Sequence, residues 1–194
     1  MTGEEGRRAL EALFEGNARF AAGRPEHPRR GTARRAETSR GQRPAAAVVS
    51  CSDSRVPPEI VFDQGIGDLF VVRAAGNLVD ELGLASIEYA VEHLGVPLVV
   101  VLGHSLCGAI AAALEGAPSE GGLGRLVKAL QPAVERARGA ADPADAAARE
   151  NVRSIVASLR SSEPILKPLA ATGALAVVGA FYDIERGVVE IIEG

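Results

Sequence analysis

Short, uninterrupted apolar runs recur along the chain and predict its strands. They lie at residues 45–50, 68–74, 97–103 and 174–184. Runs without alternating polar positions are typical of strands covered on both faces of a parallel sheet. A fifth run, 187–192, follows the turn residues Glu-Arg-Gly and predicts an antiparallel hairpin partner. The pattern therefore predicts four parallel strands plus one antiparallel edge strand.

Apolar residues at helical spacing fill the segments between these runs. One stripe, between the second and third runs, consists of Leu84, Ile87, Val91 and Leu94. Residues 121–138 and 144–160 carry two more such stripes, and a further one begins the chain within residues 10–21. Buried strands that alternate with amphipathic helices indicate an α/β fold with a mostly parallel central sheet flanked by helices.

An arginine-rich segment separates the first helix from the first strand. Residues 22–44 contain seven arginines, three prolines and only two glutamates. We expect an extended, solvated arm with a role in subunit contacts, because the segment lacks the aromatic residues that accompany nucleic-acid binding. We expect residues 1–194 to form a single domain, with an N-terminal helical arm in 1–44 and an α/β core in 45–194.

Composition narrows the class of protein. The 194 residues are 47% hydrophobic and carry a net charge of −4, so a globular protein is expected, without nucleic acid as a partner. No apolar run reaches the roughly 18 residues that cross a bilayer, so no membrane partner is expected. The charged N-terminal segment does not resemble a signal peptide, and we expect a cytoplasmic protein.

The two cysteines of the chain lie next to predicted strand ends. Cys51 follows the first apolar run, while His104 and Cys107 follow the third. Ligands of parallel sheets gather at the carboxyl ends of the strands, so these loops meet if the two strands are neighbours. Thiolate and imidazole are ligands that Zn²⁺ prefers, and three protein ligands leave a fourth position for water. Asp53 is placed to occupy or guard that position.

Other interpretations of the same residues remain open at this point. The cysteines could be small buried hydrophobic residues or form a disulfide, although cytosolic thiols stay reduced. Cys51 and His104 could be a nucleophile and its base, or the zinc could be purely structural. Arg55, two residues after Asp53, argues against a structural zinc because it can hold that carboxylate ionised and oriented.

The motifs "CSDSRVPPEIVFDQGIGDLFVVRAAGN" and "GHSLCGA" together resemble those of the β-class carbonic anhydrases. The segments "LFEGNARF", "GQRP" and "YDIERG" extend the resemblance over nearly the whole chain. The resemblance implies one Zn²⁺ per chain, held by Cys51, His104 and Cys107. It also implies that Asp53 and Arg55 form a catalytic dyad, with Asp53 becoming a fourth zinc ligand in a closed state.

The activity implied by the resemblance is reversible hydration of carbon dioxide to bicarbonate and a proton through zinc-bound hydroxide. It further implies a homodimer or homotetramer. Its substrate-binding residues would be Gln42, Phe70, Tyr89 and Gly108. For Phe70, core packing is an equally good interpretation, and Gln42 rests on the resemblance alone. His27 and His93 are interpreted as ordinary surface residues.

One departure from the family pattern affects regulation. Some bacterial members have an inhibitory bicarbonate site that uses a tryptophan three residues before the first cysteine ligand. Val48 occupies that position here, although Arg73 and Tyr182 match other parts of that site. We therefore expect Asp53 to rest on Arg55 at neutral pH. Two alternative functions are hydrolysis of carbonyl sulfide or carbon disulfide on the same scaffold, and a non-catalytic zinc- or bicarbonate-binding module.

Overall fold

A central sheet organises the computed structural model, which describes residues 3–116 and 120–194. In these residues the sheet has five strands in the order β2-β1-β3-β4-β5. The first four run parallel to one another, and β5 pairs with β4 in the antiparallel direction. Their bounds are β1 (Ala46–Cys51), β2 (Leu69–Ala74), β3 (Leu98–His104), β4 (Ala176–Asp183) and β5 (Val188–Glu193). The predicted sheet is confirmed, with every strand end within two residues of its expected place.

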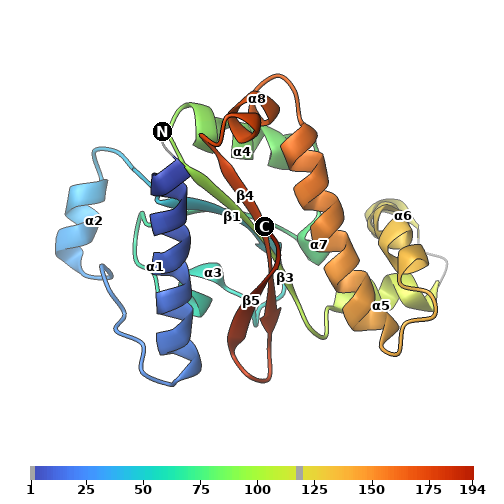
Figure 1. Cartoon of the computed structure of the whole chain (residues 1–194). Coiled ribbons are helices and arrows are strands. Elements are labelled where there is room, and N and C mark those ends of the chain that lie inside the picture. Colours follow the sequence, from blue (N-terminus) through green and yellow to red (C-terminus); the bar gives the residue numbers. More distant parts are fainter. Residues whose placement is uncertain (1–2, 117–119) are drawn as a thin grey trace.

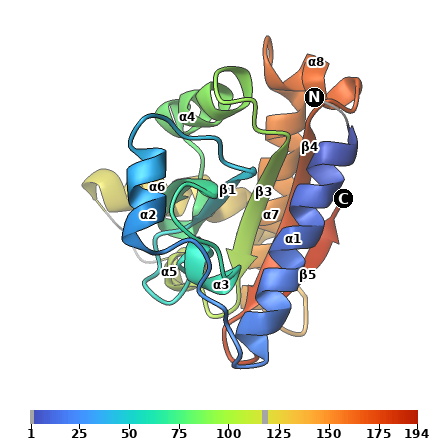
Figure 2. The same cartoon turned by 90° about the vertical axis from the view of Figure 1, so that its left-hand side faces the viewer.

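Helices cover both faces of this sheet (Figures 1 and 2). Side chains of α1 and α3 pack on one face, and those of α4, α7 and α8 pack on the other. A third cluster, formed with α5 and α6, contains both cysteines. The bounds are α1 (Gly3–Ala21), α3 (Pro58–Val61), α4 (Glu81–Glu92), α5 (Gly108–Glu115), α6 (Gly121–Arg136), α7 (Pro143–Ser161) and α8 (Leu166–Ala171). The three-layer α/β architecture follows the predicted helical stripes.

The position of the strands between two layers of helices explains why their sequences lack alternating polar residues. Val48 of β1 faces the α1 layer, whereas the next residue, Val49, faces the α4 and α7 layer. Successive side chains of a strand point to opposite faces, so a strand with helices on both sides needs apolar residues at every position. All six residues of β1 are buried accordingly.

The prediction of an extended, solvated arm is wrong in part. Residues 22–44 include the helix α2 (Thr32–Thr38), and several of their arginines bond to the chain's own core. Arg29 Nε lies 2.7 Å from Asp68 Oδ2, and Arg34 Nε donates to the Ile66 carbonyl at 2.8 Å. Composition of the segment alone did not reveal these partners, because they lie more than 30 residues further along the chain.

The described ranges contain no helix that is a candidate for crossing a membrane. None of the helices there is both long enough and apolar enough to pass through a bilayer.

Candidate metal centre

The strand order brings the three predicted zinc ligands together. β1 and β3 are neighbours, with Ser50 paired to Leu102, so Cys51 and His104 reach the same edge of the sheet. Cys107 immediately precedes α5, whose first turn begins at this edge. The ligand atoms of Cys51, His104 and Cys107 all lie within 4.8 Å of one another, and all three residues are buried.

The imidazole of His104 is oriented for metal binding. Its Nδ1 lies 2.8 Å from the carbonyl oxygen of Ser105, so Nδ1 carries the proton and donates it to that carbonyl. Its other ring nitrogen, Nε2, is therefore the one that could bind a metal. This buried atom has no hydrogen-bond partner within the described part of the chain. Ligating histidines in metal sites characteristically bond through their second nitrogen in this way.

The two thiols form an unequal pair. A hydrogen bond from the Cys107 thiol lowers the pKa of Cys51 to about 3 against the opposing effect of burial. His104 and the N–H groups of Asp53 and Gly76 add to this effect, with the Gly76 nitrogen 3.2 Å from the Cys51 sulfur. The same contact and burial raise the pKa of Cys107. Both cysteines are free thiols, so the disulfide interpretation is wrong.

The donor set fits a zinc ion. Thiolates and a neutral imidazole are borderline-soft ligands, and Zn²⁺ binds them in tetrahedral sites. The lone buried Nε2 of His104 gives independent support, because an unsatisfied buried acceptor is costly unless something binds it. Three candidate ligands converge here, which matches the number found in zinc sites that keep one position open.

A carboxylate–guanidinium pair stands beside the three ligands. Arg55 Nε donates to Asp53 Oδ1 at 2.9 Å, and Arg55 Nη2 donates to Asp53 Oδ2 at 2.7 Å. The Arg55 guanidinium holds the pKa of Asp53 well below its usual range. Nη2 also donates to the carbonyl of Leu106, one residue before the Cys107 ligand. Asp53 is therefore ionised and bonded to Arg55 in this structure.

The residues discussed for an inhibitory bicarbonate site have other contacts here. Arg73 donates to the carbonyl oxygens of Cys51 and Asp53, at 2.9 and 2.7 Å, and so supports the loop that follows β1. Val48 is fully buried in the core on the α1 face, and Tyr182 is buried in the same cluster. Both belong to the packing that holds α1 against the sheet.

The four predicted substrate-binding residues do not lie close together within a single chain. Gly108 lies directly after the Cys107 ligand, at the start of α5, and no described atom lies within 4 Å of the place where a Cβ would stand. Phe70 pairs with Ala47, so it sits about 13 Å along the sheet from the level of Cys51. The Phe70 and Tyr89 rings lie 6.3 Å apart, and Tyr89 is 46% exposed.

Gln42 lies further from the ligands, in the segment between α2 and β1. It lines an open groove of about 420 Å³ together with Arg34 and Arg43. His27 and His93 are exposed, as expected for surface residues. Within a single chain, neither the Phe70–Tyr89 pair nor the groove that contains Gln42 includes any of the three candidate ligands.

Sequence reasoning missed a buried asparagine close to the centre. Asn151 Nδ2 donates to the carbonyl oxygen of Gly76 at 2.8 Å, and the N–H of Gly76 bonds to the Cys51 sulfur. A detectable signal was present: Asn151 lies four residues from both Ala147 and Ile155 on the buried face of α7. A polar side chain at a core position of an amphipathic helix needs a specific partner.

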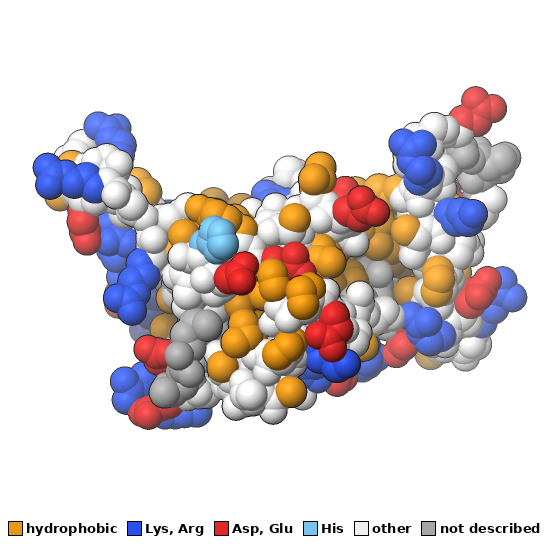
Figure 3. Space-filling view, turned by 90° about the horizontal axis from the view of Figure 1, so that it is seen from above, with side chains coloured by type: hydrophobic (Ala, Val, Ile, Leu, Met, Phe, Trp, Pro, Cys, Tyr) orange, Lys and Arg blue, Asp and Glu red, His pale blue; other side chains and the backbone are white. Residues whose placement is uncertain are grey.

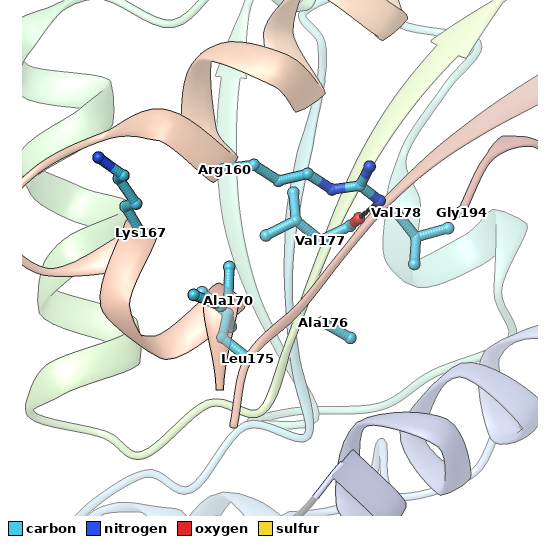
Figure 4. A pocket seen from close by; sticks show the side chains of 9 residues that line it. Arg160, Lys167, Ala170, Leu175, Ala176, Val177, Val178 and Gly194 are labelled. Carbon is cyan, nitrogen blue, oxygen red and sulfur yellow. Dashed lines mark hydrogen bonds between the residues drawn. The ribbon is translucent and has the colours of Figure 1, made fainter. Parts of the chain in front are cut away.

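A separate hollow of about 460 Å³ lies at the amino end of β4, beside α8 (Figure 4). Arg160 and Lys167 are among the residues that line it, but each already has a partner. Arg160 donates to the Val177 carbonyl at 2.6 Å, and Lys167 pairs with Glu163 at 2.9 Å. This hollow does not contain the metal ligands, which belong to the opposite, carboxyl end of the sheet.

Comparison with known proteins gives a consistent result. A family model described as "Carbonic anhydrase" matches residues 46–189. The chain is 45% identical to a carbonic anhydrase of Mycolicibacterium smegmatis, over 94% of this chain and 91% of that protein. It is 44% identical to carbonic anhydrase 2 of Mycobacterium tuberculosis, over 92% of this chain and 89% of that protein.

Solved structures agree with the sequence relatives. A structure from a study of two tetrameric β-carbonic anhydrases of Sordaria macrospora superposes with a TM-score of 0.75 at 32% identity, covering 81% of this chain and 84% of that one. A Coccomyxa β-carbonic anhydrase in complex with acetazolamide gives a TM-score of 0.74 at 28% identity, covering 95% and 86%. The family match, the relatives and the shared fold together show that this chain belongs to the β-carbonic anhydrase family, an enzyme family of carbonate dehydratases.

Proposed function

We propose that the protein catalyses the reversible hydration of carbon dioxide to bicarbonate and a proton. One Zn²⁺ would be held by Cys51, His104 and Cys107. The observation that carries the proposal is the unpaired, buried Nε2 of His104, with two thiols whose sulfurs lie within 4.8 Å of it. When bound, the zinc would lower the pKa of a coordinated water toward about 7, so that a nucleophile is available near neutral pH.

Asp53 and Arg55 would orient the reacting oxygen. The bidentate bond to Arg55 engages both oxygens of Asp53 and keeps this carboxylate ionised, so it acts only as a hydrogen-bond acceptor. A carboxylate fixed in this way selects one orientation of a hydroxyl group beside it. Asp53 can also leave Arg55 and become a fourth zinc ligand, which would close the site to substrate.

The start of α5 would contribute to product binding. Gly108 opens this helix directly after Cys107, and the space beside its Cα is free of described atoms. Unpaired backbone N–H groups at a helix start favour negative charge. The N–H of Gly108 would stabilise the charge that develops as neutral carbon dioxide becomes bicarbonate, whereas a side chain at position 108 would obstruct access to it.

A second copy of the chain would complete the substrate pocket. Figure 3 shows a hollow with apolar side chains between two projections, of which the left contains α2 and the right contains α6. On α4, Leu82 is 78% exposed and Tyr89 is 46% exposed, and β2 is only half-buried. A partner docked here would cover these residues and place its own Gln42, Phe70 and Tyr89 against the neighbouring metal centre. We propose a homodimer or homotetramer that works in the cytoplasm, where the thiols stay reduced.

Stopped-flow measurement of carbon dioxide hydration across about pH 6.5–9, with zinc determined on the same sample, tests the proposal. We expect about one zinc per chain and a rate that rises with pH as the nucleophile forms. Rates measured in parallel with carbonyl sulfide and carbon disulfide should be far lower. A rate close to the uncatalysed background at every pH, in zinc-loaded protein, would refute the proposed activity.

A further inference from the structure

Asn151 is a buried polar residue that no step proposed so far requires. It is 4% exposed and lies on the inner face of α7, between Ala147 and Ile155 at helical spacing. An amide at such a position costs stability unless its hydrogen bonds are made. The Nδ2 group of Asn151 donates to the carbonyl of Gly76, 75 residues earlier in the chain. This bond is the specific contact that distinguishes Asn151 from an apolar residue on the same face.

Gly76 is held by several elements at once. It occupies the middle of the short turn η1 (Ala75–Asn77) with φ 67° and ψ 23°, the left-handed conformation that favours glycine. A Cβ at this position would lie 3.2 Å from the side chain of Leu130 on α6 and 3.4 Å from that of Ala109 on α5. The carbonyl is held by Asn151 of α7, while the N–H donates to the Cys51 sulfur at 3.2 Å.

These contacts form a continuous path from α7 to a metal ligand. We propose that Asn151 is a positioning residue, which keeps the N–H of Gly76 directed at the sulfur of Cys51. The inference deepens the proposed function and rests on the zinc site described there. A thiolate that accepts an N–H hydrogen bond donates less charge to its metal, so the metal remains a stronger Lewis acid. The same bond restricts the sulfur to one orientation and pre-organises the site.

The experiment uses Co²⁺ in place of zinc, because thiolate-to-cobalt charge-transfer bands report directly on the sulfur ligands. In Asn151→Ala we expect these bands to move to lower energy, since Cys51 becomes a stronger electron donor when its N–H bond is lost. We also expect zinc affinity, measured by competition with a chromophoric chelator, to fall about tenfold, because loss of pre-organisation of the Cys51 sulfur outweighs its stronger donation. Neither measurement depends on catalytic turnover.

Asn17 provides a matched control in another part of the core. It is 3% exposed, and its Nδ2 donates to the carbonyls of Val61 and Gly187 at 3.1 and 2.9 Å. Asn17→Ala therefore also removes a buried amide bonded to backbone carbonyls, but none of these bonds involves a metal ligand. We expect this variant to melt at a lower temperature while its cobalt spectrum and zinc affinity stay at wild-type values.

The outcomes separate the two proposals. If Asn151→Ala has the same cobalt spectrum and zinc affinity as Asn17→Ala, the positioning role is overturned, while a metal-loaded wild type leaves the proposed function intact. A wild type that binds neither cobalt nor zinc overturns both. Asn151→Leu, which keeps a similar volume and a helix-compatible side chain, gives the same test if the alanine variant does not fold. The leucine variant should show the same band shift and loss of zinc affinity.

Discussion

Asp53 and Asp63 both bind an arginine, and the surroundings of these two carboxylates differ sharply. Asp53 lies at the rim of the candidate metal centre and bonds to Arg55, which is only two residues away. The Arg55 side chain is about half exposed. Asp63 is fully buried and bonds to Arg19, which is 44 residues distant and lies on α1. The first pair consists of neighbours in one loop, whereas the second joins the first helix to the core.

The two carboxylates also differ in the number of partners that hold them. Burial alone would raise the pKa of Asp63, but Arg19 and the N–H groups of Glu26 and His27 outweigh it and hold that pKa below its usual value. Among the described residues, Arg55 is the one residue that bonds to the Asp53 carboxylate, through its backbone N–H and its guanidinium. A carboxylate at the rim with one partner residue can exchange that partner, while a fully buried carboxylate held by three residues of α1 and the following segment is fixed. The same ion-pair chemistry therefore suits movement at the rim and anchoring in the core.

The largest effect is expected from removing a proposed ligand of the metal centre beside Asp53. Cys51→Ala removes one of the three proposed zinc ligands, so we expect the purified variant to contain little zinc. Activity should fall by more than about 100-fold, the loss that is typical when an outer-shell partner of a metal site is removed. Elemental analysis and stopped-flow assays on the same preparation measure both. Retention of one zinc per chain would contradict the assignment of Cys51 as a ligand.

Asp53→Ala tests the carboxylate that we expect to exchange its partner. We expect turnover to fall about 100-fold, because the oriented acceptor is lost, while zinc content stays unchanged. The free energy of unfolding should change by less than about 1 kcal/mol, since exposed ion pairs contribute little to stability. Turnover, zinc content and urea denaturation of one sample check these points. Full activity in this variant would rule out a catalytic role for the Asp53–Arg55 pair.

Asp63→Asn tests the buried carboxylate that we expect to be fixed by its partners. We expect a loss of about 2 kcal/mol in the free energy of unfolding, because Arg19 and two backbone N–H groups lose their charged acceptor. Turnover per folded, zinc-loaded chain should stay near the wild-type value at low temperature. Urea denaturation and steady-state assays provide both numbers. A variant as stable as the wild type would show that the Asp63 contacts do not anchor α1.

The smallest effect is a difference in acid stability. The pKa of Asp63 is lower in the folded state than in the unfolded state, where it is about 3.9. Its stabilisation is therefore complete above about pH 5, where the carboxylate is ionised in both states, and is lost as the pH falls through the folded pKa. Unfolding free energies measured from about pH 6 down to pH 3 should fall more steeply for the wild type than for Asp63→Asn. Parallel curves would contradict a lowered pKa in the folded protein.

The ion pairs of Asp63 and Asp68 explain why the prediction of a solvated N-terminal arm was wrong in part. A run of arginines is usually a solvated surface, and composition alone supports that interpretation. Here Arg29 and Arg34 reach Asp68, and Arg19 reaches Asp63. Nothing within residues 22–44 identifies these acceptors, because burial of the two aspartates depends on how α1 and the arm cover the sheet.

The sequence by itself determined the strands, the main helices and the three ligand candidates. Apolar runs and helical stripes are local properties, and the Cys-x-Asp-x-Arg and His-x-x-Cys motifs each occupy only a few consecutive residues. The bonding of Asp53 to Arg55 could be expected for the same reason, since two residues separate them.

Only the tertiary structure decided which distant groups meet. The order β2-β1-β3 brings Cys51 to His104, and the packing of α7 over η1 brings Asn151 to Gly76. A long-range contact depends on strand order and on complementary buried surfaces, neither of which is encoded in the spacing of neighbouring residues. The same reason separates Gln42, Phe70 and Tyr89 from the ligands within one chain, where a second copy is needed to bring them to the site we propose.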